Sequence, residues 1–336
     1  MYASESQGLR ASDGEREQAA GRLHDAATQG RLSAHEQRRT VLITGATSGI
    51  GYHTAIGLAG QGARVLITGR NEFRGVNAVA EIRRLAGHDR VEFFAAEHST
   101  VAGNRQLAER VEGALLRDGA SLDVLVNNVG RVFGTRQDTV EGIEQTLALC
   151  AVGPVALTEG LLPILRISRQ PRIVNVVSSA YKMWKGDPFA DLLSEDGYVG
   201  LQVHARAKLL NLIWTFALAD QFGDAFAVNA TNPGAAWTDG TASLTPEAVP
   251  AWRYVWLIVR FFQRRASAES AADTPIWLAS ARETAAMTGY YVQKRKRERP
   301  AVATDPGNQQ RALASLHALI HNASGASRTP EHPAPR

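Results

Sequence analysis

Cysteine is nearly absent from the sequence, since Cys150 is the only one in 336 residues. A single thiol cannot form an internal disulfide and cannot supply several ligands to a metal ion. A disulfide scaffold and a cysteine-rich metal centre are therefore both excluded. We expect a protein of a reducing compartment that has no metal site.

Long hydrophobic runs and a large excess of one charge are also missing. No uninterrupted apolar stretch approaches the ~20 residues that span a bilayer, and residues 1–39 are too polar for a signal peptide. The 37 Lys and Arg nearly balance the 33 Asp and Glu, which gives a formal net charge of +4. The one dense basic run, residues 294–299, is interpreted as a solvated loop rather than a polyanion-binding patch. We expect a cytoplasmic protein with no membrane span and no nucleic-acid partner.

The overall composition is typical of a soluble globular protein, with 44% hydrophobic, 7% aromatic and 21% charged residues. Residues 1–38 have few large apolar side chains and predict a short helical N-terminal extension. Residues 324–336 are rich in Pro, Ser and Arg without periodicity and predict a disordered tail. Residues 39–323 are expected to fold as one domain.

Short β-branched runs alternate along this domain with stretches of helical periodicity. That alternation is typical of a parallel sheet covered by helices, so it predicts an α/β fold with a doubly wound, Rossmann-type sheet of about seven strands. The five clearest runs are residues 41–43, 65–67, 91–94, 124–126 and 173–177. Residues 225–230 and 290–292 could add edge strands.

A glycine-rich loop, TGATSGIG at residues 44–51, follows the first predicted strand. Gly45, Gly49 and Gly51 permit a tight turn and close backbone approach, and a predicted helix begins after them. Amide N–H groups and the positive end of a helix dipole bind a pyrophosphate, so the loop predicts a dinucleotide site. Thr47, Ser48 and Ile50 complete that predicted site.

The end of the second predicted strand bears on the choice of cofactor. An acidic residue there would accept hydrogen bonds from the ribose 2′-hydroxyl of NAD, but this sequence has Arg70 and Asn71. A guanidinium attracts a 2′-phosphate, which favours NADP(H) over NAD(H). Glu72 is close enough in sequence to keep NAD(H) open.

Three further motifs carry a family resemblance: NNVG at residues 127–130, RIVNVVSS at 172–179 and NPGAAWT at 232–238. Together with the glycine loop, their order and spacing resemble the short-chain dehydrogenase/reductase family. Gly289, Tyr290 and Tyr291 further resemble its retinol-dehydrogenase-like branch. The resemblance implies an oxidoreductase fold with a nicotinamide cofactor, a small-molecule substrate and a homo-oligomer.

The resemblance also assigns individual residues to the cofactor. Gly45, Ser48, Gly49 and Ile50 would line the pyrophosphate. Asn127 and Gly130 would lie beside the adenine ribose, and Pro233, Gly234 and Thr238 would flank the nicotinamide. Glu97 stands where family members usually carry an Asp that meets the adenine amino group.

The catalytic residues match the family only in part. Ser178 matches the Ser that hydrogen-bonds the substrate oxygen, and Lys208 matches the Lys that binds the nicotinamide ribose. His204 occupies the position of the proton-transferring Tyr, and Cys150 occupies the position of the supporting Asn. Two of the four catalytic residues are therefore replaced.

The replacement of Tyr by His changes the acid–base chemistry. A Lys cation lowers the pKa of a Tyr from ~10 towards neutrality, but it holds an imidazole of ordinary pKa ~6.5 in the neutral form. Neutral His204 could donate one hydrogen bond to a carbonyl or accept a proton from an alcohol, so we expect oxidation to suffer less than reduction. Tyr181 is either an alternative proton donor or an aromatic pocket wall. Cys150 is interpreted as a small apolar replacement, since no His partner for a nucleophile is evident from the sequence.

Aromatic residues near the predicted pocket indicate a bulky apolar substrate. Residues 252–262 are aromatic-rich and fall where family members place a helical lid, and Trp184 and Trp237 are nearby in the sequence. We expect an NADP(H)-dependent oxidoreductase that acts on a carbonyl or alcohol, with a role in secondary metabolism. A non-redox enzyme on the same fold (a cyclase, isomerase or dehydratase) and an inactive cofactor-binding scaffold remain open.

Overall fold

The computed structural model describes residues 39–234 and 267–326. The predicted N-terminal extension, Thr238 and the predicted lid at residues 252–262 lie outside the described residues. Helix α12, Pro306–Ala326, continues three residues past residue 323, where the folded domain was expected to end. The rest of the predicted tail, residues 327–336, also lies outside the described part.

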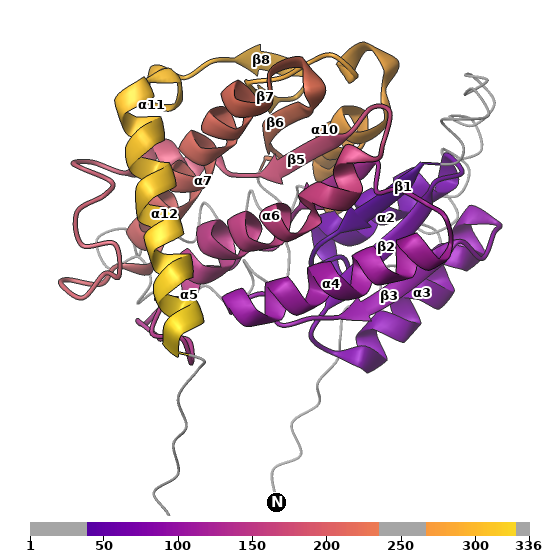
Figure 1. The fold of residues 1–336 in the computed structure, drawn as a ribbon, viewed down its shortest axis with the longest axis horizontal. Coiled ribbons are helices and arrows are strands. Elements are labelled where there is room, and N and C mark those ends of the chain that lie inside the picture. The colour runs from indigo at the N-terminus through magenta and orange to yellow at the C-terminus, as the bar shows by residue number, and fades with distance from the viewer. Residues whose placement is uncertain (1–38, 235–266, 327–336) are drawn as a thin grey trace, which may run out of the picture.

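In the described residues one eight-stranded sheet forms the centre of the molecule, with the strand order β3-β2-β1-β4-β5-β6-β7-β8 (Figure 1). All neighbouring strands are parallel except β7 and β8. This confirms the doubly wound α/β fold. The strands are β1 Thr40–Ile43, β2 Arg64–Gly69, β3 Val91–Ala95, β4 Val124–Asn127, β5 Arg172–Val176, β6 Ala227–Asn232, β7 Tyr290–Gln293 and β8 Lys296–Glu298.

The central strands are buried on both faces, which explains their nearly continuous apolar sequences. Every residue of β1 (TVLI), β4 (VLVN) and β5 (RIVNV) is buried. Strand β6 is also fully buried and pairs with β7, so it is an internal strand rather than the edge strand expected from the sequence.

Strand β8 raises the strand count from the expected seven to eight, and it comes from the basic run predicted to be a loop. Lys294 and Arg295 adopt positive φ angles of 49° and 62°, and this tight turn brings β8 antiparallel to β7. All three residues of β8 are exposed and charged. Their composition is that of a loop, so the pairing with β7 could not be read from it.

Helices cover both faces of the sheet (Figure 1). One face packs against α2, α3 and α10, and the other packs against α4, α6 and α7, with α12 lying along α7. Short helical turns connect these elements. The longer helices are α2 Gly49–Gly60, α3 Glu72–Ala86, α4 Val101–Arg117, α6 Gly153–Arg166, α7 Gly200–Phe222 and α10 Ala268–Ser280, and the shorter ones are α5 Gln145–Leu147, the π-helix η2 Ala148–Val152, η3 Ser179–Met183, η4 Gly223–Ala225, η7 Arg282–Thr284 and α11 Ala301–Thr304.

Helices α5, η2 and α6 run on as one stretch, Gln145–Arg166. Within the described residues, this is the stretch that is long and apolar enough by composition to cross a membrane. The core helix of an α/β domain has the same composition, and 72% of the most apolar window is buried inside the protein. It packs against α4 and contributes Leu157, Leu161 and Ile164 to the main core.

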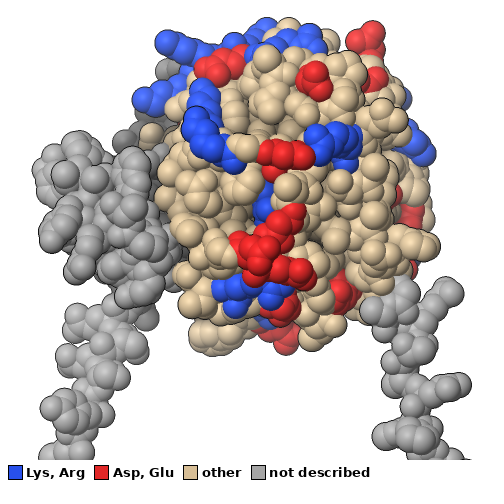
Figure 2. Space-filling view, turned by 90° about the vertical axis from the view of Figure 1, so that its left-hand side faces the viewer, with Lys and Arg blue, Asp and Glu red and all other residues tan. Residues whose placement is uncertain are grey.

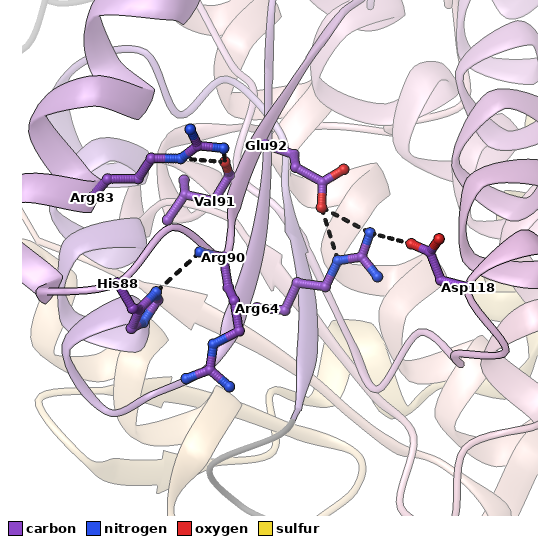
Figure 3. A network of polar contacts seen from close by, with 7 residues as sticks. All are labelled: Arg64, Arg83, His88, Arg90, Val91, Glu92 and Asp118. Atoms are coloured by element: carbon purple, nitrogen blue, oxygen red, sulfur yellow. Dashed lines mark hydrogen bonds and ion pairs between the residues drawn. The ribbon is translucent and has the colours of Figure 1, made fainter.

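A polar network stabilises the amino ends of β2 and β3 (Figure 3). The Arg64 guanidinium donates to Glu92 Oε1 at 2.9 Å and to Asp118 Oδ2 at 2.7 Å, which joins β2 to β3 and to the end of α4. Arg83 of α3 donates twice to the carbonyl oxygen of Val91. The glycine-rich loop follows the opposite, carboxyl end of β1, so this network lies away from it.

Candidate active site

The glycine-rich loop connects β1 to α2 at the carboxyl edge of the sheet, beside the end of β4. Gly45 and Gly49 have φ angles of 64° and 60°, which favour glycine. A Cβ atom at Gly51 would lie 2.5 Å from Asn128 Nδ2 and 2.8 Å from the Gly45 carbonyl oxygen. The loop is therefore packed too closely for side chains at Gly45 and Gly51.

The first turn of α2 is open to an anion. Ser48 is the N-cap residue, and its side chain makes no capping hydrogen bond. The backbone N–H groups at a helix start lack partners within the helix and carry the positive end of the dipole. This geometry, at the switch point between β1 and β4, is the one that binds a pyrophosphate.

Two residues that the sequence reasoning did not select hold this loop in place. Asn128 donates from Nδ2 to the Thr44 carbonyl oxygen at 2.9 Å, and the Thr44 hydroxyl accepts from the backbone N–H of Asn128 at 2.9 Å. This reciprocal pair ties the end of β1 to the end of β4. The NNVG motif contained the signal, but only the first Asn was assigned a role.

Arg70 follows the carboxyl end of β2 and is exposed. Within the described part of the chain no hydrogen bond or ion pair occupies its guanidinium. Asn71 caps helix α3 by accepting a hydrogen bond from the backbone N–H of Arg74 at 2.9 Å. Thr47 packs against Gly69 at the end of β2. The Thr47 methyl group lies so close that a Cβ atom added at Gly69 would be 2.7 Å from it. The glycine loop and Arg70 therefore border the same edge of the sheet.

Asn127 and Glu97 use their side chains within the protein. Asn127 is buried, and its Nδ2 donates to Thr158 Oγ1 at 3.0 Å and to Asn175 Oδ1 at 2.8 Å. Glu97 Oε1 accepts from the backbone N–H of Ser99 at 2.8 Å. Asn127 and Gly130 were both assigned to the adenine ribose. Asn127 is buried, whereas Gly130 is exposed at the surface.

Lys208, Cys150 and His204 meet beside Gly130. The Lys208 ammonium donates to the Val176 carbonyl oxygen at 2.8 Å, which fixes it at the end of β5. A Cβ at Gly130 would lie 3.0 Å from Lys208 Nζ and 3.4 Å from Cys150 Sγ. Cys150 Sγ in turn lies 4.0 Å from His204 Nδ1. The structure thus brings three of the five predicted catalytic residues together.

The electrostatics of this cluster favour neutral side chains. Enclosure in the protein, together with the Lys208 cation, lowers the pKa of His204 to about 3. Burial raises the pKa of the Cys150 thiol, although Lys208 opposes that effect. At neutral pH the imidazole is therefore uncharged and the thiol keeps its proton.

The sequence interpretation of Cys150 needs one correction, because a His partner does lie within contact distance. The two residues are 54 positions apart, so no pattern within one segment could indicate their contact. The thiol is fully buried, which suppresses the thiolate that a nucleophile requires. The structure therefore still does not favour a nucleophilic role.

Ser178 and Tyr181 lie after β5, on and beside the short helix η3. The Ser178 hydroxyl accepts from the backbone N–H of Ala180 at 3.1 Å, and among the described residues it has no hydrogen bond to His204. Tyr181 is buried edge-on against Tyr291 at 5.4 Å between ring centroids, and burial raises its pKa to about 12. These contacts favour the pocket-wall interpretation of Tyr181 over the proton-donor role.

A chain of buried amides and hydroxyls supports the Cys150 backbone. Asn211 Nδ2 donates to the Cys150 carbonyl oxygen at 2.7 Å, and the Asn211 carbonyl oxygen accepts from the Thr215 hydroxyl. Thr215 Oγ1 accepts from Asn175 Nδ2, which links the chain to Asn127. Cys150 lies in the π-helix η2, where one carbonyl is displaced from the regular ladder. Asn211, also missed in the sequence, supplies a donor to this turn.

The predicted nicotinamide residues follow β6. Gly234 donates its backbone N–H to Asn232 Oδ1 at 3.1 Å, and Pro233 and Gly234 are half-buried at the same carboxyl edge of the sheet. Thr238 lies outside the described residues, so its assignment stays a prediction.

Comparison with known proteins identifies the family. The family model for short chain dehydrogenases matches residues 39–186. Polyprenol dehydrogenase of Mus musculus is 31% identical over 283 residues, which cover 82% of this chain and 81% of that protein. The chain belongs to the short-chain dehydrogenase family.

Two further relatives indicate the branch of the family. Retinol dehydrogenase 12 of Homo sapiens is 35% identical over 197 residues, 58% of this chain and 61% of that protein. DnrU of Streptomyces sp. (strain C5), whose name proposes a daunorubicin C-13 ketoreductase, is 32% identical over 294 residues, 86% and 92% of the two chains. The expected retinol-dehydrogenase-like branch is confirmed.

Solved structures show the same fold. An uncharacterized protein from Mycobacterium paratuberculosis has a TM-score of 0.63 at 27% identity, covering 84% of this chain and 93% of that one. Levodione reductase has a TM-score of 0.60 at 23% identity, covering 76% and 95%. Both structures therefore share the fold over most of this chain.

The family's nicotinamide cofactor fits the residues observed here. The close packing at Gly45 and Gly51, the open first turn of α2 and the position of Lys208 together form a cradle for a dinucleotide. The backbone of the glycine loop would hold the pyrophosphate, and Lys208 would hold the nicotinamide ribose.

Proposed function

We propose that this chain is an NADP(H)-dependent oxidoreductase that interconverts a carbonyl and an alcohol on a bulky apolar small molecule. The observation that carries the proposal is Arg70 beside the glycine loop, whose exposed guanidinium has no partner among the described residues. At that position it is free to pair with a 2′-phosphate through a charge-assisted, bidentate contact.

Each residue of the site has a role in this proposal. The cofactor supplies the hydride chemistry when bound. Lys208, anchored on the Val176 carbonyl oxygen, holds the ribose and keeps the neighbouring imidazole neutral. Ser178 would release its contact with Ala180 to hydrogen-bond the substrate oxygen. His204 would exchange the proton of that oxygen, in place of the Tyr of the family.

Aromatic side chains support an apolar substrate. Trp184 and Phe189 are half-buried against the core cluster that contains Tyr181 and Tyr291. They lie on the segment between β5 and α7, which the family uses for its substrate pocket. The name of the relative DnrU points to the C-13 ketone of daunorubicin, and we extend a role in secondary metabolism to this chain on that ground.

The cofactor assignment is tested by titrating the full chain with NADPH and NADH. We expect NADPH to bind at least several-fold more tightly, and Arg70→Ala to remove that preference, because the contact is worth ~1.5–3 kcal/mol. Arg74→Ala on the neighbouring helix serves as a matched control for general loss of positive charge. Equal affinities for both cofactors in the native chain would overturn the NADP(H) assignment.

The reaction class is tested by His204→Tyr. A phenol four residues before Lys208 regains the acid whose pKa that cation lowers, so reduction of aromatic and polycyclic ketones should increase ~10-fold or more. NADPH affinity should stay unchanged, because the substitution spares the glycine loop. Loss of a native non-redox reaction in this variant would instead support the cyclase, isomerase or dehydratase alternative.

A further inference from the structure

The two positions that depart from the family pattern contact each other. Cys150, from the π-helix η2, and His204, from α7, approach to 4.0 Å between Sγ and Nδ1. The thiol lies equally far, 4.0 Å, from the Arg131 carbonyl oxygen. Two substitutions that contact in this way are best considered as one unit.

Only one assignment of hydrogen-bond donors and acceptors satisfies both contacts of the Cys150 thiol. A carbonyl oxygen only accepts, so the thiol proton is the donor to Arg131. The sulfur is then left as an acceptor, and a neutral imidazole can donate to it only from Nδ1. In the described part of the chain Nε2 of His204 has no hydrogen-bond partner. With Nδ1 protonated, Nε2 carries the free lone pair.

We propose that Cys150 is a positioning residue that holds His204 in the Nδ1–H tautomer, so that Nε2 acts as a proton acceptor for an alcohol substrate. This inference rests on the proposed function for its catalytic part. In the oxidation step the alcohol O–H bond breaks and its proton passes to Nε2, which releases it to solvent because Lys208 disfavours the imidazolium. The carbinol C–H bond breaks with its electron pair passing to the oxidised nicotinamide, and the carbon–oxygen bond becomes a carbonyl.

The surrounding charges keep His204 in the neutral form, which can accept a proton at Nε2 but has none there to donate. Lys208 of α7 faces the imidazole and disfavours imidazolium, and the other charged group that acts on the pair is the buried carboxylate of Glu144, at the start of α5. Glu144 accepts hydrogen bonds from the backbone N–H groups of Thr146 and Leu147, so its charge is already partnered. Alcohol oxidation at this site should therefore be independent of pH above the His204 pKa, whereas ketone reduction should fall about tenfold per pH unit.

The tautomer itself can be measured without any substrate. The full chain, labelled with ¹⁵N in the rings of its 9 histidines, is compared with His204→Gln to assign the His204 signals by long-range ¹H–¹⁵N correlation. We expect protonated Nδ1 and unprotonated Nε2 in the native chain, and a shift towards the Nε2–H form in Cys150→Ala. Cys150→Ser keeps one donor and one acceptor, so it should retain the native tautomer.

The matched control is Val152→Ala, which removes buried apolar volume from the same π-helix without touching the pair. It should leave the His204 signals unchanged. An Nε2–H tautomer in the native chain, an unchanged tautomer in Cys150→Ala, or an equal shift in Val152→Ala would each overturn the proposal.

Kinetics separate this inference from the proposed function. In Cys150→Ala we expect kcat for alcohol oxidation to fall about 5-fold, the equilibrium worth of one weak hydrogen bond, with KM and NADP⁺ affinity unchanged. Cys150→Ser should restore most of the rate. If the chain binds no nicotinamide cofactor, the proposed function fails, yet the NMR result still decides the tautomer. If it oxidises alcohols while the tautomer is unaffected by Cys150, only this inference fails.

Discussion

Thr68 joins the glycine loop to a buried histidine. Its hydroxyl accepts from the backbone N–H of Gly45 at 3.2 Å and lies 2.6 Å from His98 Nε2. Asn104 donates through Nδ2 to the His98 and Thr100 carbonyl oxygens, so its Oδ1 must accept from His98 Nδ1. His98 is therefore the Nδ1–H tautomer, and the Thr68 hydroxyl donates to its Nε2.

Thr68→Val tests these hydrogen bonds, because it replaces the one hydroxyl that joins Gly45 to His98. The valine matches the shape of threonine but leaves Gly45 N–H and His98 Nε2 without their partner, which should destabilise the fold by about 1–3 kcal/mol. Because Gly45 loses its anchor, NADPH affinity should fall as well. Urea denaturation and cofactor titration measure the two effects. Thr54→Val, whose hydroxyl only returns to its own helix at Ile50, is the control.

The glycine loop could be predicted from the sequence because its signal is local. A strand, three glycines and a helix follow one another within a few residues, and their backbone requirements are fixed by sterics. The contact between Cys150 and His204 joins positions 54 residues apart and depends on how η2 packs on α7. Patterns within one segment contain no information about such a contact.

At the scale of one element, Arg206 of α7 holds the segment between β5 and α7. Its buried guanidinium donates to the carbonyl oxygens of Ala190, Asp191 and Leu192 and to the hydroxyl of Ser194. It also lies 5.1 Å over the Trp184 ring. Residues 187–196 have no regular strand or helix, so this one side chain supplies much of their order.

Arg206→Met should release that segment. Several backbone carbonyls would lose their shared donor, which should lower the free energy of unfolding by about 2–4 kcal/mol. Hydrogen exchange and limited proteolysis should localise the change to residues 187–196. Under the proposed function the substrate KM should rise while NADPH affinity stays constant. Arg206→Lys, with a single ammonium, should give an intermediate result, and equal protection of the segment in all variants would contradict this role.

Strand β8 shows why element boundaries escaped the sequence reasoning. Alternation of apolar and polar residues identifies strands that are half or fully buried, but all three residues of β8 are charged and exposed. Its pairing depends on the turn at Lys294 and Arg295, which have positive φ angles. Such turns are usually recognised in a sequence by glycine or asparagine, and neither residue occurs at these two positions. Strands β1 to β7, which are half or fully buried, all fall within the predicted runs to a few residues.

At the scale of the whole molecule, stability should depend on pH through its enclosed histidines. Burial is the main cause that lowers the pKa values of His53, His98 and His204. The unfolded chain takes up protons near the ordinary histidine pKa of ~6.5, whereas the folded chain does not. Their contribution is therefore complete above pH ~6.5 and is lost as pH falls below it.

We expect Tm to fall steadily between pH 6.5 and pH 4.5, because the free energy of unfolding decreases by up to ~1.4 kcal/mol per pH unit for each such histidine. Calorimetry across this range measures the slope. His98→Asn should reduce the slope even though it lowers Tm at neutral pH, because it removes the most deeply enclosed of the three groups. A Tm independent of pH down to 4.5 would contradict the assignment.

Deleting residues 1–38 should leave the folded domain intact. These residues offer little apolar surface, and Arg39, the first described residue, already anchors the start of β1 through the carbonyl oxygens of Ala279 and Ser280. We expect Tm to change by less than about 4 °C and NADPH affinity to stay the same. A truncated chain that aggregates or loses cofactor binding would show that the extension contributes to folding or assembly.

Positive and negative side chains are mixed on the face that α12 borders (Figure 2). Lys and Arg gather along its upper rim, at the end of the molecule where Figure 1 places β8, with acidic side chains among them. At β8 Lys182 pairs with Glu298 at 3.6 Å, and Arg295 of the turn before β8 pairs with Asp273 at 2.7 Å. These ion pairs offset part of the charge of the basic run.

The strand order also determines how the sheet is completed as the ribosome releases the chain. β4 adds beside β1, and each later strand then adds beside the one synthesised just before it. The growing sheet therefore always presents its newest strand at the open edge, where the apolar β5, β6 and β7 could pair with another nascent chain. Completion of β8 replaces that edge with three charged, exposed residues. Its synthesis marks the point after which intermolecular strand pairing at this edge, and the aggregation during translation that such pairing would cause, is no longer favoured.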